Sequence, residues 1–353
     1  MPAYTTIDDP SAYFKVQLYT GTGSSHAVSF NDTDTNMQPD MVWIKQRSDT
    51  NDHNLFDAVR GTGKLIRPNG TNAEGDTSEG VKSFDSDRFT CGTNSSLNGS
   101  TSTYVAWCWK AGTTSGITTT GANITPSAYS MNATSGISII KYEGNGTDGT
   151  NTAHALGAVP HVIICKRLEN SNYWAVYHHK NTSAPNTDYL VLNATDATSD
   201  AGLWKDTDPT SVYFRHDNST SVNANGEDMV AYLFTSIQGF SKFGKYTGNV
   251  NADGVFIYLG FKPALFIVKE TGNAEPWVMY DNRRGDYGNA NPIDQHLVAS
   301  GTAVESSGTA IDFLSNGVKI RSNAGHLNEG DYIYMAWAET PFVNSNGVPC
   351  NAR

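Results

Sequence analysis

The stretch Pro263-Ala264-Leu265-Phe266-Ile267-Val268-Lys269 determines how the chain is interpreted, because two close variants of it occur earlier. The variants are Pro39-Asp40-Met41-Val42-Trp43-Ile44-Lys45 and Pro160-His161-Val162-Ile163-Ile164-Cys165-Lys166. Each consists of a proline, five mostly apolar residues and a lysine. A short apolar run that begins at proline and is rich in β-branched and aromatic residues is typical of a buried β-strand. We therefore expect three equivalent buried strands.

Two further patterns keep the same order around each of these strands. An aromatic-glycine turn precedes the strand, at Tyr19–Gly23, Tyr142–Gly146 and Tyr246–Asn249. A closing strand follows it, at Tyr104-Val105-Ala106-Trp107, Met229-Val230-Ala231-Tyr232 and Tyr334-Met335-Ala336-Trp337. Because self-similarity at a long period indicates an array of like units, the sequence predicts three divergent copies of one β-domain.

The predicted fold class is all-β, with three tandem β-sandwich (jelly-roll-like) pseudo-repeats of about 100 residues each. A chain of 353 residues is long enough for two or three domains. The expected parts are an N-terminal arm (1–12), repeat 1 (13–112), a Thr/Ser/Gly-rich linker (113–135), repeat 2 (136–238), repeat 3 (239–343) and a C-terminal tail (344–353).

Composition and charge exclude several functions. The net charge of −11 argues against nucleic acid as a partner, because binding to the phosphate backbone needs a basic surface. The sequence has no run of 18 apolar residues, so membrane insertion is not expected. The N-terminus does not resemble a secretory signal. We expect a protein made in a cytoplasm, with Cys91, Cys108, Cys165 and Cys350 as reduced thiols.

No catalytic or metal-binding motif is identified, and no cofactor is expected. A nucleophile elbow, a zinc motif and a Cys/His pairing are all missing from the sequence. Paired carboxylates from distant strands remain open, because their spacing in space does not follow from spacing along the chain. Calcium binding also remains open for the acidic loops Asn31–Asn36 and Lys205–Asp208, neither of which has the full EF-hand series.

Aromatic residues divide into two groups. Five tryptophans lie in or next to the repeated strands and are assigned to the cores of the three β-sandwiches: Trp43, Trp107, Trp174, Trp277 and Trp337. Trp204, Tyr213 and Tyr287 lie in or beside polar loops instead. Exposed aromatic rings on the loops of a β-sandwich stack on sugar rings, so these three are the candidate ligand-binding residues.

The ordered motifs resemble a repeat domain of unknown function carried by virion proteins of marine tailed bacteriophages. The motifs are the Tyr-x-Gly turn, Pro-x5-Lys, Trp-x-x-Tyr at Trp174 and Trp277, Ile311–Lys319, and Tyr334–Phe342. The resemblance covers most of the chain after Tyr13 and is strongest in the second and third units. It implies a tail-fibre-like or other structural role on the particle, and it supplies no catalytic residues.

These observations lead to one preferred function and two alternatives. We expect a non-enzymatic bacteriophage structural protein, assembled in the host cytoplasm and displayed on the virion surface. Its expected partners are other tail or capsid proteins, a host surface glycan and further copies of the same chain, with a homo-trimer favoured. The alternatives are a capsid decoration protein or head fibre, and a polysaccharide-degrading tailspike enzyme.

Overall fold

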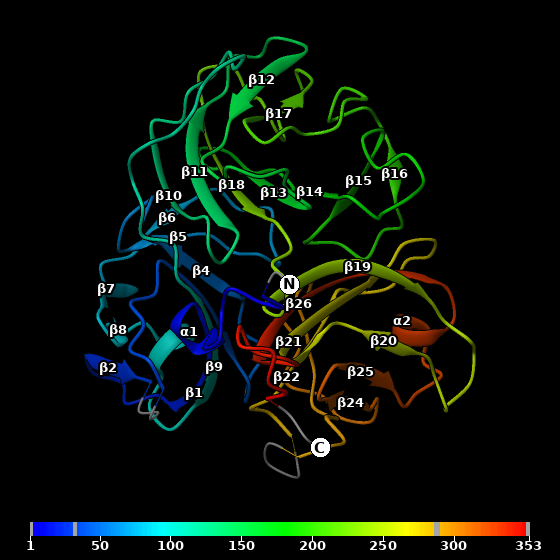
Figure 1. Cartoon of the computed structure of the whole chain (residues 1–353). Helices are drawn as coiled ribbons and strands as arrows, with labels where there is room; N and C mark the ends of the chain where they lie inside the picture. The colour runs from blue at the N-terminus through cyan, green and yellow to red at the C-terminus, as the bar shows by residue number, and fades with distance from the viewer. Residues whose placement is uncertain (1–2, 31–33, 286–289, 351–353) are drawn as a thin grey trace.

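The computed structural model of the chain describes residues 3–30, 34–285 and 290–350. The described chain consists mostly of antiparallel strands, with one 3-10 turn, η1 (Pro10–Ala12), and two short helices, α1 (Ser95–Asn98) and α2 (Gly325–Asn328). The predicted all-β class is confirmed at this level. Figure 1 shows three lobes around a common centre, one formed by the blue and cyan part of the chain, one by the green part and one by the yellow to red part.

Each lobe contains one large antiparallel sheet. From one edge to the other, the first sheet consists of β1 (Phe14–Thr20), β9 (Thr103–Trp109), β3 (Met41–Gln46) and β4 (Asn54–Asp57). The second consists of β10 (Ala128–Asn132), β11 (Ile137–Glu143), β18 (Asp228–Phe234), β13 (Val162–Arg167), β14 (Ala175–His178), β15 (Asp188–Val191) and β16 (Ser199–Asp200). The third consists of β19 (Ser241–Thr247), β26 (Asp331–Pro341), β21 (Phe261–Glu270), β22 (Val278–Asp281) and β23 (Leu297–Val298).

Small sheets accompany the large ones in each lobe. The first lobe has β2 (His26–Ser29), β8 (Arg88–Cys91) and β7 (Val81–Asp85), together with the pair β5 (Lys64–Leu65) and β6 (Gly75–Asp76). The second has β12 (Thr150–Ala153) and β17 (Tyr213–His216). The third has β20 (Phe256–Tyr258), β25 (Gly317–Ile320) and β24 (Ile311–Leu314).

The large sheets are buried on both faces. Along β3, Val42 and Ile44 belong to the same hydrophobic cluster as Val28 of the small sheet beside it. Met41 and Trp43 alternate with them and join a cluster shared by all three large sheets. Strands covered on both faces are almost continuously apolar, which explains why the repeated segments lack a polar-apolar alternation.

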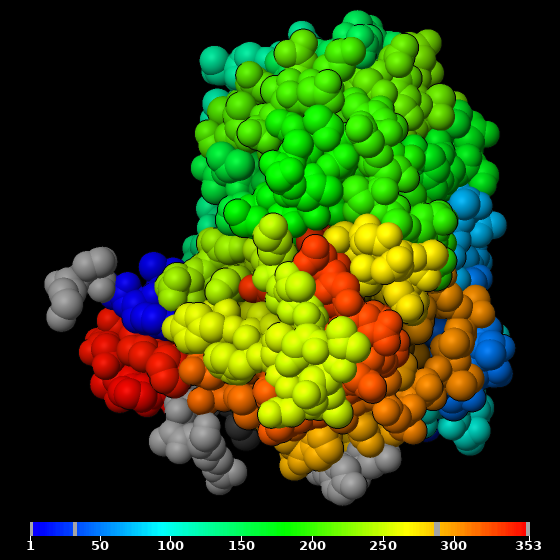
Figure 2. All heavy atoms as spheres, turned by 90° about the vertical axis from the view of Figure 1, so that its right-hand side faces the viewer, coloured from blue at the N-terminus to red at the C-terminus, as the bar shows by residue number. Residues whose placement is uncertain are grey.

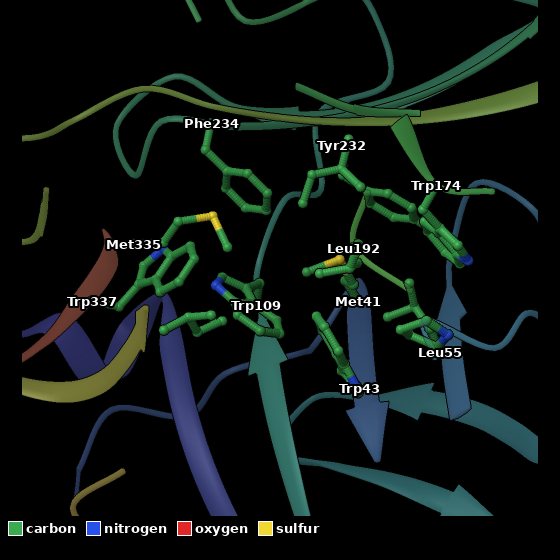
Figure 3. Close-up of a pocket in the computed structure, with 13 residues that line it drawn as sticks. Met41, Trp43, Leu55, Trp109, Trp174, Leu192, Tyr232, Phe234, Met335 and Trp337 are labelled. Atoms are coloured by element: carbon green, nitrogen blue, oxygen red, sulfur yellow. The ribbon is translucent and has the colours of Figure 1, made fainter. Parts of the chain in front are cut away.

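The shared core corrects one expectation about the tryptophans. All five of them lie in this cluster between the sheets rather than in three separate cores: Trp43, Trp107, Trp174, Trp277 and Trp337. Figure 3 shows how Trp43 and Trp109 of the first sheet, Tyr232 of the second and Trp337 of the third converge. Large rings are suited to this junction because three sheet faces must be covered at once, and the void left among them is only about 20 Å³.

Three buried lysines occupy matching strand positions. Lys45 lies opposite Val105, Lys166 opposite Val230, and Lys269 opposite Ile333 of the neighbouring strand. Their ammonium groups donate to carbonyl groups of the loops that follow, at Asp49 (3.0 Å), Asn172 (2.9 Å) and Asn273 (3.4 Å). Burial lowers the pKa of each lysine to about 8. The lysine that marks each repeated strand therefore ties a loop to its sheet.

Three fully buried asparagines make the same hydrogen bonds in the three lobes. The side-chain oxygens of Asn98, Asn223 and Asn328 accept the backbone N–H of Thr22 (2.8 Å), Asn145 (2.8 Å) and Asn249 (3.0 Å). Each amide group also donates to a carbonyl just after the same turn, at Ser24, Thr147 or Asn251, and to one on another segment, at Gly92, Asp217 or Ser322. Each asparagine thus holds the aromatic-glycine turn against the segment that precedes the closing strand.

The register of the closing strand differs from the expected one in the third lobe. Tyr19 lies opposite Tyr104, whereas Tyr246 lies opposite Tyr332. The hydroxyls of Tyr104 and Tyr332 both bond to the short helix beside them, at Ser95 and Gly325. The expected match of Tyr334 to Tyr104 is therefore wrong by two residues.

Polar contacts link the three large sheets in a closed cycle. Tyr232 of the second sheet donates to Asp57 of the first (2.6 Å), and Trp107 of the first donates to Asp281 of the third (3.0 Å). His178 of the second sheet completes the cycle by donating to the Tyr334 carbonyl of the third (3.2 Å). Its other ring nitrogen accepts the Lys180 N–H, which fixes the proton on the donating nitrogen.

A second cycle of contacts between the lobes starts from the residues that directly precede β4, β14 and β22. Trp174 donates to the Arg67 carbonyl (3.0 Å), Trp277 donates to the Val191 carbonyl (2.9 Å), and His53 bonds to the Val298 carbonyl (3.0 Å). The three lobes therefore form one continuously bonded body.

Parts of the expected linker, N-terminal arm and C-terminal tail are also packed against the lobes. Residues 128–132 of the expected linker form β10, which pairs with β11. In the N-terminal arm, Ile7 is buried in the shared core and Thr5 donates to the Gln238 carbonyl (2.8 Å). Ser345 of the expected tail bonds to Asp8 of the arm through its backbone N–H (2.6 Å).

Candidate functional site

The structure places the three predicted ligand-binding aromatics in different situations. The expected exposure of Trp204 is wrong, because this side chain is 2% exposed, donates to the Asp188 carbonyl (3.1 Å) and packs edge-on against Tyr177. Its loop folds back over the core of the second lobe, so the apolar ring is removed from water. Tyr213 is half-buried on β17, and Tyr287 lies outside the described residues.

Two other aromatic rings are exposed together on one strand. Phe256 and Tyr258 on β20 are 46% and 48% exposed, whereas Ile257 between them is 5% exposed and packs inward. Residues two apart on a strand point to the same face and lie about 6.6 Å apart. We call Phe256 and Tyr258 the aromatic strip. β20 lies on the right of Figure 1, the side that faces the viewer in Figure 2.

Glycine leaves space for one ring of the strip. Tyr258 lies opposite Gly317 on β25, and Phe256 lies opposite Lys319. A β-carbon at Gly317 would lie 2.1 Å from the Ile257 carbonyl oxygen and 3.0 Å from two ring atoms of Phe256, so no other residue fits there without a shift of its neighbours. The Phe256 ring therefore lies over the Gly317 backbone, with one side against the sheet.

The other ring is held by a cation and by a second tyrosine. Lys242 lies 5.3 Å from the centre of the Tyr258 ring and donates to the Tyr258 carbonyl (2.7 Å). Burial lowers the pKa of Lys242. The Tyr4 hydroxyl is 3.3 Å from the Tyr258 hydroxyl and donates to the Gly260 carbonyl (3.0 Å). Burial, followed by the Tyr258 contact, raises the pKa of Tyr4 to about 12, so its hydroxyl is neutral at pH 7.

Charged pairs surround the strip on the side of β25 and β24. Lys319 pairs with Asp253 (2.7 Å), and Arg321 pairs with Asp312 (2.6 Å). Asp253 is largely exposed, and the pair with Lys319 lowers its pKa. The surface thus combines two accessible ring faces with several hydrogen-bonding groups at its edge, which is a composition suited to binding an amphipathic ligand.

The fold of the small sheet does not require exposed aromatic residues at the positions of Phe256 and Tyr258. On β2, the strand next to β8 in the first lobe, the outward residues that flank buried Val28 are Ala27 and Ser29. A small sheet of the same kind is therefore built without exposed rings. Sequence analysis did not single out Phe256-Ile257-Tyr258, because it considered aromatics in polar loops and because the exposure of alternate residues on β20 follows only from the structure.

Metal binding finds no support within the described ranges, where no group of three or more His, Cys, Asp or Glu side chains could hold a metal ion. Lys205, in one of the two acidic loops considered for calcium, pairs with Asp148 (2.7 Å). Part of the other loop (31–33) is outside the described residues. No described helix has the length and hydropathy needed to cross a bilayer.

Fold and surface together define a class: a β-rich protein in which three antiparallel sheets share one core and one lobe carries an exposed aromatic strip. A family model matches residues 9–341 in one span, and the chain belongs to that family, a domain of unknown function (DUF7483). Curated proteins gave no significant match. The matched span includes all three large sheets, so the family corresponds to the whole three-lobed body.

Proposed function

We propose that the chain is a non-enzymatic structural protein of a bacteriophage particle, tail-fibre-like, which attaches the particle to host surface glycans or bridges tail components. In this proposal the three lobes are tandem copies of one jelly-roll-like β-sandwich. The observation that carries the proposal is the closed cycle of contacts through Asp57, Asp281 and His178, because it joins three like lobes into a single stiff block.

The recurrence of specific contacts supports the three-copy origin. The buried asparagines Asn98, Asn223 and Asn328 recur with the same partners, and so do the buried lysines of the central strands. Hydrogen bonds of this detail are not required by a β-fold in general. Their repetition therefore favours duplication of one domain over three unrelated domains.

Interior charges support a structural role. Arg60 donates to Asp57 (2.6 Å) and to Glu74 (3.0 Å), and Arg284 donates to Asp281 (2.7 Å) and to Glu305 (3.1 Å). Removing one partner of a buried ion pair lowers the free energy of unfolding by about 3–5 kcal/mol. These arginines therefore hold Asp57 and Asp281 in place for their contacts with Tyr232 and Trp107 of other lobes. The resemblance of the motifs to phage virion proteins supplies the biological context.

Locating the chain tests the proposal. Purified particles of the source phage should contain the chain by mass spectrometry, and electron microscopy should place its three-lobed density on the tail. Density on the capsid would favour the decoration or head-fibre alternative, and absence from particles would contradict the proposal. Sustained release of reducing ends from host polysaccharide would favour the tailspike alternative. Light scattering tests the predicted homo-trimer.

A further inference from the structure

We propose that the aromatic strip on β20 is a binding surface for a saccharide chain, with Phe256 and Tyr258 stacking on successive sugar rings and Lys242 positioning the Tyr258 ring. The inference deepens the proposed function, on which it rests for the biological source of the saccharide. It replaces Trp204 as the site of glycan contact, since Trp204 is buried.

Ring spacing and ring accessibility favour a sugar chain. The two rings project from the same face of one strand, about 6.6 Å apart, and each is nearly half exposed. A pyranose ring has one apolar C–H face, which stacks on an aromatic ring, and hydroxyl groups around its edge. Two rings in a row on a straight strand can therefore contact two sugar units of one chain.

Polar groups next to the rings fit the hydroxyl edge of such a ligand. The Tyr4 and Tyr258 hydroxyls, Lys319 and Asp253 lie beside the strip and provide both donors and acceptors. Lys319 and Asp253 neutralise one another, as do Arg321 and Asp312. The Lys242 ammonium lies against the Tyr258 ring and donates to the Tyr258 carbonyl. The strip therefore suits a neutral saccharide, and binding should depend only weakly on salt.

The size of the strip argues against a protein partner. A buried aromatic side chain contributes about 150–250 Å², so two half-exposed rings offer roughly 200 Å². A stable protein interface needs about 800 Å² on each partner. The pairs Lys319–Asp253 and Arg321–Asp312 adjoin the strip, so an apolar protein surface would have to bury charge to extend it.

Stiffness of the local backbone favours a preformed site. Lys242 holds Tyr258 from the neighbouring strand β19, and Tyr4 fastens the chain after β20 through Gly260. Gly317 fixes how closely Phe256 approaches the sheet. Rings held in place before binding lose little conformational freedom when the ligand arrives.

The test uses the full chain and defined saccharides. Cellohexaose, chitohexaose, dextran and a purified bacterial O-antigen polysaccharide are titrated into the protein, with saturation-transfer NMR and calorimetry as readouts. We expect binding of at least one of them, with saturation of the sugar C–H protons. Phe256→Ala and Tyr258→Ala should each weaken binding about ten-fold, the change produced by roughly 1.4 kcal/mol. Tyr258→Phe should bind within about three-fold of the original protein, because the ring is retained.

Three variants separate stacking from other causes. Phe256→Leu combined with Tyr258→Leu keeps an apolar surface without flat rings, and it should lose saccharide binding. Val159→Ala combined with Val304→Ala removes exposed apolar groups elsewhere and should bind normally. Lys242→Gln removes the cation beside the ring and should weaken binding while Tyr258 remains. Circular dichroism and the unfolding midpoint verify that each variant is folded.

Clear outcomes overturn the inference. The inference is wrong if none of the four saccharides binds the original protein at millimolar concentration. It is also wrong if the double leucine variant binds saccharide normally. Self-association that persists in the double leucine variant and disappears when Phe256→Ala is combined with Tyr258→Ala would identify an interface between copies instead. If strip variants bind saccharide normally while the chain is found on particles, only the strip assignment fails. If the strip binds saccharide but the chain is absent from particles, only the proposed function fails.

Discussion

Tyr232 and Asp57 lie in different sheets, and the Tyr232 hydroxyl donates a 2.6 Å hydrogen bond to the Asp57 carboxylate. Both side chains are buried, and Arg60 donates to the same carboxylate oxygen. Burial, more than the nearby charges, raises the pKa of Tyr232 well above its usual value, so the hydroxyl keeps its proton and remains a donor. This pair is one of the three links that close the cycle between the lobes.

Replacing Tyr232 by Phe should therefore destabilise the whole chain. The variant leaves a buried carboxylate without one of its donors, so the free energy of unfolding should fall by roughly 1–3 kcal/mol. Chemical denaturation monitored by fluorescence measures the change. Tyr213→Phe, at a half-buried position on β17, is the matched control and should have little effect. In a double-mutant cycle with Asp57→Asn, strictly additive effects would show that the two residues are not coupled.

Alanine at Asn98, Asn223 or Asn328 should destabilise the protein to a similar extent in each case. Each change removes three hydrogen bonds between a fully buried side chain and the backbone, so we expect a loss of roughly 2–4 kcal/mol at every position. Denaturant unfolding of the three variants gives the comparison. Asn346→Ala, at an exposed position near the end of the chain, should be neutral. One asparagine with no effect would contradict the idea that the three turns are held in the same way.

Glycine in place of Val250 should stabilise the chain. Val250 has a φ of 58°, in the left-handed region, where a β-branched residue is strained, and its side chain is 62% exposed. The comparable turns of the other lobes have Gly23 and Gly146 there, at φ of 70° and 62°. Release of about 1–2 kcal/mol of strain outweighs the roughly 0.5–1 kcal/mol entropic cost of glycine. Val304→Gly, another exposed valine, should not stabilise, and a lower midpoint for Val250→Gly would refute the strain.

Acid should weaken the protein through His178. Burial, with a smaller contribution from neighbouring His179, lowers the pKa of His178 to about 3, and His161 and Lys180 add further positive charge. Above a pH of about 6.5 the side chain is neutral in folded and unfolded chains, and its contribution to stability is complete. As the pH falls from about 6.5 towards 3, the unfolded chain binds a proton that the folded chain excludes, so stability is lost.

His178→Gln tests this mechanism, because glutamine can still donate to the Tyr334 carbonyl without titrating. At a pH of about 5 the original protein should lose roughly 2 kcal/mol through this group relative to a pH of about 7.5. Unfolding curves at the two pH values give the loss for both proteins. The variant should show a correspondingly smaller loss, although His179, whose pKa is about 4, retains part of the effect. An unchanged pH dependence would contradict the assignment.

Sequence reasoning identified the central and closing strands of the three large sheets, because buried strands have a strong local pattern. Lys45, Lys166 and Lys269 were correctly placed within such strands. The match of Tyr334 to Tyr104 failed for a physical reason: a shift of two residues leaves every side chain on the same face of its sheet. Alternation alone therefore cannot distinguish Tyr332 from Tyr334, and only the pairing with Tyr246 does so.

The candidate site was harder to predict than the fold. A polar neighbourhood in the sequence suggested that Trp204 is exposed, but the loop that carries it folds over the second lobe. Which loop covers a core depends on contacts between distant residues, and these leave no local signal. Phe256, Ile257 and Tyr258 are all apolar or aromatic, so which face of β20 another segment covers is decided only in three dimensions.

Because the three lobes are linked in a single chain, the surface of each lobe can differ from the surfaces of the other two. Head-to-tail contacts such as Tyr232 to Asp57 form a closed cycle only when three lobes are present. If the lobes were separate molecules, formation of the cycle would depend on their concentration. Within one chain closure is guaranteed at any dilution, and a substitution in one lobe is not copied into the other two. His178 can then occupy the position held by Asp57 and Asp281, and a pair of exposed rings can be introduced once rather than three times. A cycle of three lobes in one chain can therefore be asymmetric.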